Sequence, residues 1–130
     1  MNVMDKKLLI TSTVLGLLAV VLGAFAAHGL EDRIEASAIA SFQTGVRYQM
    51  YHALLLLGIS ALPMISKKVK QITFLTILLG VILFSGSIYC LSINALTDFD
   101  FSVIGFITPI GGLLFIISWL ILLINFLKIK

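Results

Sequence analysis

Residues 8–27 have the sequence LLITSTVLGLLAVVLGAFAA and contain no charged side chain. A helix of this length, at 1.5 Å per residue, is about 30 Å long, which matches the hydrocarbon core of a bilayer. The apolar residues are continuous rather than alternating, so the pattern favours a membrane-spanning helix over a barrel strand. Lys6 and Lys7, with the small residues Ala24 and Ala26, also fit a signal peptide, but the apolar run exceeds the usual length of about 7–15 residues. We therefore expect a retained first span.

Three further apolar stretches follow, at residues 48–65, 72–96 and 103–127. The chain as a whole is 60% hydrophobic and 12% charged, whereas soluble domains average about 45–50% and about 25%. This composition excludes a soluble globular enzyme, a disordered chain and a disulfide-stabilised scaffold. We expect residues 1–130 to form one transmembrane domain, an all-α integral membrane four-helix bundle with spans at about 8–27, 48–65, 72–96 and 103–127.

Basic residues gather on one side of this predicted bundle. They lie before span one, between spans two and three, and after span four: Lys6, Lys7, Lys67, Lys68, Lys70, Lys128 and Lys130. The acidic residues of the opposite side are Glu31, Asp32, Glu35, Asp98 and Asp100. The positive-inside rule then places both termini in the cytoplasm. No basic patch lies beside stacking aromatic residues, so we expect the lipid bilayer as a partner and no nucleic acid.

The connection between spans one and two, residues 28–47, contains a helical pattern. Ile34, Ala38, Phe42 and Gly45 recur at spacings of three or four, and polar residues occupy the other faces. This pattern predicts a short amphipathic helix at the interface between spans one and two, either separate from span two or running directly into it.

Rows of small residues mark the predicted spans as helices that pack closely. The glycines in these rows are Gly16, Gly23, Gly80, Gly86, Gly111 and Gly112. Small residues four apart allow two helix backbones to approach each other in a membrane. Packing within one bundle and packing between protomers both remain open.

Pro109 interrupts the fourth apolar stretch. It donates no backbone hydrogen bond and disfavours the helical conformation at Thr108. If the helix begins near Val103, Pro109 lies beyond its first turn and a kink is expected. Irregular backbone at membrane depth is buried or lines a wet cavity. The proline therefore indicates either a helix start or kink, or the end of a half-helix that binds an ion or substrate.

Polar side chains form a candidate site at the outer ends of the spans. Its members are His28, Arg47, Tyr48, Gln49, His52 and Thr108. Tyr48 and His52 are four residues apart and share one helix face. We expect His28, Tyr48, His52 and Thr108 to converge at the outer mouth of the bundle. Such groups act either as interfacial anchors, with Arg47 reaching toward an outer carboxylate, or as a proton, ion or ligand site.

From the remaining reactive side chains we predict no catalytic group, no bound metal and no cofactor. Two histidines without a suitably placed carboxylate or cysteine are weak evidence for a metal site. Cys90 has no second cysteine with which to pair, so we expect a buried, inert thiol. Ser85 and Ser87 lie in apolar sequence without a nearby base.

Four blocks of the sequence resemble one family of small membrane proteins. They are GAFAAHGL (23–30), FQTGVRYQMYHAL (42–54), FSGSIY (84–89) and TPIGGLLFI (108–116). In order and over nearly the whole chain they resemble the bacterial domain of unknown function 423, or YgdD/YwdK-like family, which is similar to eukaryotic transmembrane protein 256. The resemblance implies a four-helix protein of the bacterial inner membrane, and it implies no established activity. Ala26 stands where relatives usually carry glycine.

Three functional hypotheses follow from the sequence. The leading one is a non-enzymatic membrane protein that packs as a homo-oligomer or within a larger membrane complex, because the small-residue rows suit helix contacts. The second is binding or transport of an ion, proton or small ligand, which requires a polar path or site. The third is a lipid-facing enzyme with His28 or His52 as its base, which requires the two rings to lie close together.

Overall fold

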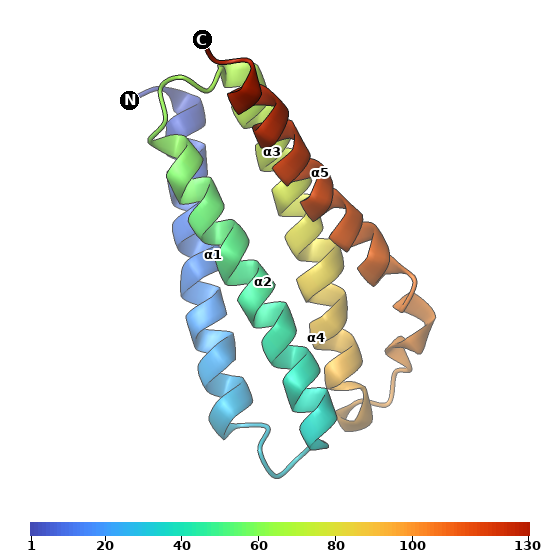
Figure 1. The fold of residues 1–130 in the computed structure, drawn as a ribbon. Helices are drawn as coiled ribbons and strands as arrows, with labels where there is room; N and C mark the ends of the chain where they lie inside the picture. Colours follow the sequence, from blue (N-terminus) through green and yellow to red (C-terminus); the bar gives the residue numbers. More distant parts are fainter.

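The computed structural model describes residues 1–130 and is entirely helical (Figure 1). Its elements are α1 (Val3–His28), α2 (Ala36–Ser60), α3 (Lys67–Gly80), the π-helical segment η1 (Val81–Gly86), α4 (Ser87–Ser92), the 3-10 turns η2 (Asn94–Leu96) and η3 (Phe101–Ile104), and α5 (Ile107–Leu127). Because α3, η1 and α4 follow one another without a break, the chain forms four long rods. Both chain termini lie at the same end of these rods (Figure 1).

Three of the rods are long and apolar enough to cross a membrane: Val3–His28, Lys67–Ser92 and Phe101–Leu127. The remaining rod, α2, has 25 residues, which corresponds to a length of about 37 Å. Its first turns are less apolar than the others, because they include Ser37, Ser41, Gln43, Thr44 and Arg47.

The amphipathic segment predicted between the first two spans is part of α2. A tight connection follows α1, and one continuous helix then runs from Ala36 to Ser60. No proline interrupts this stretch, and the bare backbone of Gly45 lies against the Tyr89 ring, where an added Cβ would come within 2.8 Å. The prediction of a separate interfacial helix is therefore wrong. The alternative prediction, that this helix runs directly into the second apolar stretch, is confirmed.

The rods pack unevenly. Helix α1 packs mainly on α2, and α5 packs mainly on α3 and η1. The rod α3–η1–α4 contacts both α2 and α5, so it joins the two pairs. Helices α2 and α5 have little direct backbone contact, and one side of the bundle is consequently open between them.

A large apolar cluster lies in the half of the bundle nearer the chain termini. Buried side chains from every rod meet there, among them Leu8, Leu15, Leu56, Ile59, Ile77 and Leu122. A smaller cluster of Ala26, Leu30 and Phe42 closes the opposite end between α1 and α2. Burying a Leu or Ile side chain away from water contributes about 1.5–3 kcal/mol, but in a bilayer close packing rather than water exclusion holds such helices together.

The small-residue rows are used for packing within the chain. A Cβ added to Gly23 would lie 3.4 Å from Val46, and one added to Gly80 would lie 2.6 Å from the Phe115 ring. Gly111 faces the backbone of η1, and Gly112 faces the ring of Phe84. Gly16 lies at van der Waals distance from Met50, whereas Gly86 approaches only the Val81 carbonyl of its own segment, at 3.9 Å. Contacts inside one chain therefore account for most of these glycines.

Pro109 does not kink the last rod. Helix α5 begins at Ile107, so Pro109 occupies its first turn, where the backbone N–H groups have no helical partner in any case. The expectation of a kink assumed a helix start near Val103. That residue instead belongs to the 3-10 turn η3, and the proline is part of a helix start.

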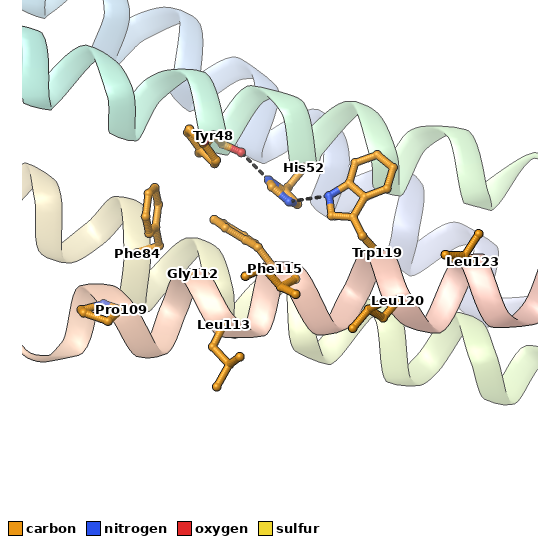
Figure 2. Close-up of a pocket in the computed structure, with 11 residues that line it drawn as sticks. Tyr48, His52, Phe84, Pro109, Gly112, Leu113, Phe115, Trp119, Leu120 and Leu123 are labelled. Atoms are coloured by element: carbon orange, nitrogen blue, oxygen red, sulfur yellow. Dashed lines mark hydrogen bonds between the residues drawn. The ribbon is translucent and has the colours of Figure 1, made fainter.

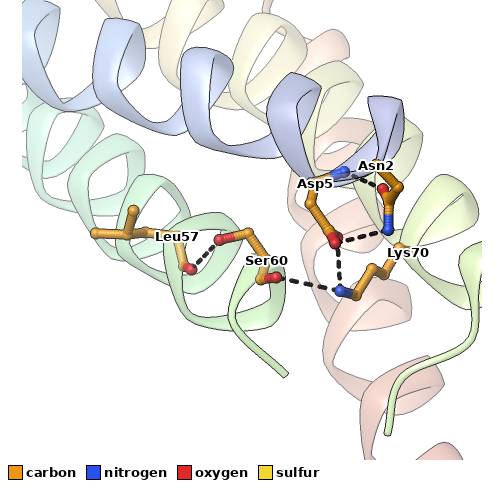
Figure 3. Close-up of polar contacts among 5 residues, drawn as sticks. All are labelled: Asn2, Asp5, Leu57, Ser60 and Lys70. Atoms are coloured by element: carbon orange, nitrogen blue, oxygen red, sulfur yellow. Dashed lines mark hydrogen bonds and ion pairs between the residues drawn. The ribbon is translucent and has the colours of Figure 1, made fainter. Parts of the chain in front are cut away.

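A buried ion pair joins three rods at the end that holds the chain termini (Figure 3). The Lys70 ammonium donates to the Asp5 carboxylate at 2.6 Å and to the Ser60 carbonyl oxygen at 3.2 Å. Asn2 caps α1 by accepting from the Asp5 backbone N–H at 2.8 Å. Because Lys70 comes from α3 and Ser60 from α2, the pair fixes the relative positions of α1, α2 and α3.

Candidate functional site

A groove with a volume of about 880 Å³ runs between α2 and α5, with η1 at one end (Figure 2). Tyr48 and His52 line it from α2, Phe84 from η1, and Phe115, Trp119 and Leu123 from α5. This volume lies within the range of about 300–1,000 Å³ that is common for small-molecule sites. The groove occupies the open side of the bundle, so it faces the surroundings of the helices.

Both ring nitrogens of His52 are hydrogen-bonded (Figure 2). The Nδ1–H group donates to the Tyr48 carbonyl oxygen at 2.7 Å, and Nε2 accepts from the Trp119 indole N–H at 3.2 Å. A carbonyl oxygen only accepts and an indole N–H only donates, so these two partners require a neutral imidazole with its proton on Nδ1. His52 is thereby held as a positioned, fully satisfied group rather than as a free base.

Aromatic rings form the wall around His52. The His52 and Phe115 rings stack with centroids 3.6 Å apart and an interplanar angle of 10°. The centroids of the Tyr48 and Phe84 rings are 5.0 Å apart. The Phe84 ring packs edge-on against the Phe115 ring, with centroids 5.4 Å apart. Aromatic pairs of this kind contribute about 0.5–1.5 kcal/mol beyond their buried area. The groove is therefore a preformed, largely apolar surface in which the His52 and Trp119 nitrogens are hydrogen-bonded within the chain.

His52→Leu is expected to destabilise the protein by about 1–3 kcal/mol, because it leaves the Trp119 N–H without an acceptor at membrane depth. Since Trp119 is the only tryptophan, its emission spectrum reports the lost bond directly. The control is His28→Leu, which changes an exposed histidine and should shift stability by less than about 0.5 kcal/mol. Equal losses in the two variants would contradict the assigned role of His52.

Gln49 belongs to a different polar cluster. Its side-chain amide donates to the Leu15 carbonyl oxygen of α1 at 2.8 Å and accepts from the Tyr89 hydroxyl of α4 at 2.7 Å. Gln49 is buried, and these bonds satisfy both ends of its amide group. The residue joins α1, α2 and α4 and does not reach the groove.

The outer mouth expected from His28, Tyr48, His52 and Thr108 does not form. His28 is exposed at the end of α1, whereas His52 lies sixteen residues beyond Ala36, the start of α2. This offset corresponds to about 24 Å along the helix axis. The Thr108 hydroxyl is instead hydrogen-bonded to the Ser87 hydroxyl of α4. All four residues were expected at one level because the second span was predicted to start at Tyr48, but α2 begins well before that residue.

Arg47 is exposed on α2, one residue before Tyr48. Its guanidinium donates to the Thr44 hydroxyl at 3.0 Å. The single ion pair of the chain joins Asp5 and Lys70, so the expected pairing of Arg47 with an outer carboxylate is wrong. The acidic residue Asp100 lies in the connection before α5, where bonds from the Ser102 backbone N–H hold its pKa below the usual carboxyl value.

The arrangement restricts the chemistry that one chain can perform. No group of three His, Cys, Asp or Glu side chains is placed to hold a metal ion. The two histidines lie far apart, so a paired catalytic role for them is lost. Between His52 and the end that holds the chain termini, the interior contains Leu56, Ile59 and Leu122 together with the buried polar side chains of Thr73 and Ser118.

The role of Trp119 and the Asp5–Lys70 pair were not predicted from the sequence. Trp119 follows Phe115 at a spacing of four, which places both on one face of α5. That spacing was a usable signal, because a lone tryptophan in an apolar span needs an acceptor for its N–H. No sequence signal pairs Lys70 with Asp5, which lies 65 residues away.

Comparisons with known proteins agree with the resemblance. The family described as "Protein of unknown function (DUF423)" matches residues 22–112. A UPF0382 membrane protein of Haemophilus influenzae is 39% identical over 98% of both chains. YwdK, a UPF0382 membrane protein of Bacillus subtilis, is 40% identical over 95% of this chain and 98% of its own.

The UPF0382 inner membrane protein YgdD of Escherichia coli is 34% identical over 97% of this chain and 93% of its own. No solved structure shows a significant match to the chain. The names of these relatives and the three long apolar rods agree on a multi-pass protein. The chain therefore belongs to the DUF423 family of inner-membrane proteins.

Proposed function

We propose that the protein is a non-enzymatic inner-membrane protein that binds the hydrocarbon chain of a membrane amphiphile in the groove between α2 and α5. The observation that carries this proposal is the groove itself: it is large, apolar and preformed, and its one buried polar side chain, His52, already has both ring nitrogens bonded within the chain. Such a surface suits an apolar ligand, because the imidazole and indole nitrogens in it are already hydrogen-bonded.

The groove also has the right length for a lipid chain. Along α5 its lining extends from Pro109 to Leu123, which is about 21 Å at 1.5 Å per residue. One leaflet of the hydrocarbon core is about 15 Å thick, half of the total of about 30 Å. A chain that enters at Pro109 therefore has room to lie along α5 beyond Trp119.

Trp119 provides the test, because it is the only tryptophan and lies in the groove. In vesicles that contain a small fraction of phosphatidylcholine with brominated chains, we expect quenching of Trp119 greater than the bulk fraction of brominated lipid predicts. Gly112→Leu, which fills the groove beside Phe84, should lower this quenching to the bulk level. Val20→Phe adds bulk on the exposed face of α1 and should leave it unchanged. Equal quenching in wild type and Gly112→Leu would overturn the proposal.

We infer four spans with both termini in the cytoplasm. The two termini and the lysines of the α2–α3 connection lie at one end of the rods, while the acidic connections lie at the other (Figure 1), and the positive-inside rule then gives the orientation. In a Cys90→Ser background, Asp98→Cys should react with an impermeant maleimide in intact cells. Lys130→Cys should react only after the cells are opened. Labelling of Lys130→Cys from outside would contradict this orientation.

Packing within a membrane complex is a second candidate function. Gly58 lies on the exposed side of α2 with no other atom within 4 Å of an added Cβ, next to the exposed Leu54 and Leu57. A small residue at such a position allows another helix to approach closely. In the Cys90→Ser background, Gly58→Cys should then form disulfide-linked dimers in native membranes. A strictly monomeric product would remove this candidate.

A further inference from the structure

Arg47 is a charged, exposed side chain at membrane depth. Its neighbour Val46 packs against Gly23 of α1, and Gly23 lies four residues inside Ala27, the last residue of the apolar stretch. Arg47 therefore lies at least about 6 Å inward from the outer end of that stretch. An arginine within the hydrocarbon region is costly unless an anion or water reaches it, and no carboxylate of the chain pairs with Arg47.

The Arg47 side chain is directed toward the nearer membrane surface. Helical side chains lean toward the N-terminal end of their helix, and for α2 that end lies beside the end of α1 (Figure 1). The bond from the guanidinium to the Thr44 hydroxyl places the charge one turn closer to that surface. A phosphate group at the same surface is the nearest anion that a bilayer supplies.

The guanidinium lies toward the face of α2 that lines the groove. Its hydrogen-bond partner Thr44 precedes Tyr48 by four residues, so the two share one helix face, and Tyr48 lines the groove. Tyr51 lies one helical turn after Arg47 and is 53% exposed. Its ring packs edge-on against the Tyr48 ring, with centroids 5.8 Å apart. Arg47 and two exposed phenol groups therefore stand at the point where the apolar groove opens, and a charged head attached to an apolar chain fits this juxtaposition.

We propose that the ligand of the groove is an anionic phospholipid. Its phosphate binds the Arg47 guanidinium at the outer end, and one of its acyl chains lies along α2 and α5 past Trp119. This inference rests on the proposed function, because it names the ligand of the same groove. Charge complementarity supports it: guanidinium groups bind phosphate oxygens through paired, charge-assisted hydrogen bonds.

The experiment compares two brominated lipids as quenchers of Trp119. Vesicles of phosphatidylcholine receive a small fraction of either brominated phosphatidylglycerol, which is anionic, or brominated phosphatidylcholine, which is zwitterionic. For the wild-type protein we expect the anionic lipid to bind about tenfold more tightly, which corresponds to about 1.4 kcal/mol. Arg47→Gln should abolish the preference, and it should lower quenching by phosphatidylcholine less, because the choline ammonium already offsets the charge of that lipid's phosphate. Arg47→Lys should keep only part of it, because the charge is retained but the paired hydrogen bonds of the guanidinium are lost.

Lys68→Gln is the matched control, because it removes one exposed positive charge at the other end of the rods. It should leave the preference unchanged. If the wild-type protein bound the two lipids equally while Gly112→Leu still lowered quenching, the inference of an anionic ligand would be overturned. The proposed function would then remain intact. Quenching that is insensitive to Gly112→Leu would overturn both.

A protein partner is the competing explanation for Arg47, and crosslinking distinguishes it. A photoreactive benzophenone side chain at position 47 should crosslink to lipid in native membranes. A crosslink to one discrete protein, without a lipid adduct, would show that a protein covers Arg47 and would overturn the proposal.

Discussion

Gly111→Ala is expected to destabilise the protein by about 3 kcal/mol or more, which is at or above the upper end for overpacked sites. A Cβ at this position would overlap the Phe84 backbone nitrogen and lie 2.7 Å from the Leu83 carbonyl carbon. These are backbone atoms of η1, so no side-chain rotation relieves the overlap and α5 must move away from η1. Unfolding by SDS in mixed micelles, followed by Trp119 fluorescence, measures the loss.

Gly112→Ala is the matched control, because it makes the same chemical change one residue later. A Cβ on Gly112 would lie 3.6 Å from the Phe84 ring, which is an ordinary van der Waals contact. Replacing glycine by alanine inside a helix otherwise stabilises it by about 0.5–1 kcal/mol. We therefore expect Gly112→Ala to be neutral or slightly stabilising. Similar stability of the two variants would show that α5 and η1 are not in close contact.

Glycines at the crossing of α5 with α3 and η1 explain why that contact is so close. Gly80 and Gly111 remove side chains from the α3–α5 crossing, and the Phe115 ring fills the space beside Gly80. The Ser87 hydroxyl donates to the Leu83 and Phe84 carbonyl oxygens, and the buried Ser85 hydroxyl donates to the Gly45 carbonyl oxygen. Single-turn π segments are rare and frequently occur at functional sites. Here the segment places the Phe84 ring at one end of the groove.

Asp5→Ala is the second substitution with a large expected effect, a loss of about 3 kcal/mol. It leaves the Lys70 ammonium, whose side chain is 5% exposed, with only the Ser60 carbonyl oxygen as a partner. Removing one member of a buried ion pair costs about 3–5 kcal/mol. We expect the lower end of this range, because the Asp5 side chain is itself 20% exposed. The same SDS titration measures the change.

Two variants test whether the ion pair causes this loss. Lys6→Ala removes an exposed charge from the residue after Asp5 and should change stability by less than about 0.5 kcal/mol. Asp5→Asn combined with Lys70→Met removes both charges and should recover most of the stability, because no unpaired charge stays buried. A double variant as unstable as Asp5→Ala would contradict this explanation.

The sequence predicted the class of the fold because its dominant physical constraint is local. Continuous apolar stretches of about twenty residues must be helices in lipid, since a helix satisfies its own backbone polar groups. The first, third and fourth of these stretches are the three long apolar rods. The start of the second rod was harder to predict, because residues 36–47 are polar enough to suggest an interfacial segment.

The candidate site was predicted only in part. Tyr48 and His52 do share one face of α2, as their spacing indicates, and both line the groove. His28 and Thr108 lie elsewhere, because their positions depend on how far each helix extends and on which neighbour it meets. The sequence pattern specifies neither the full extent of a helix nor the neighbour that it packs against.

The sequence by itself determined the membrane class, the helical rods and the grouping of lysines at one side, because apolar length and charge are properties of single segments. The tertiary structure alone decided which residues meet: Trp119 with His52, Lys70 with Asp5, and Gly111 with the backbone of η1. These contacts join residues distant in the chain. They depend on how the helices cross, which local sequence constrains only weakly, since many crossings bury similar apolar surface.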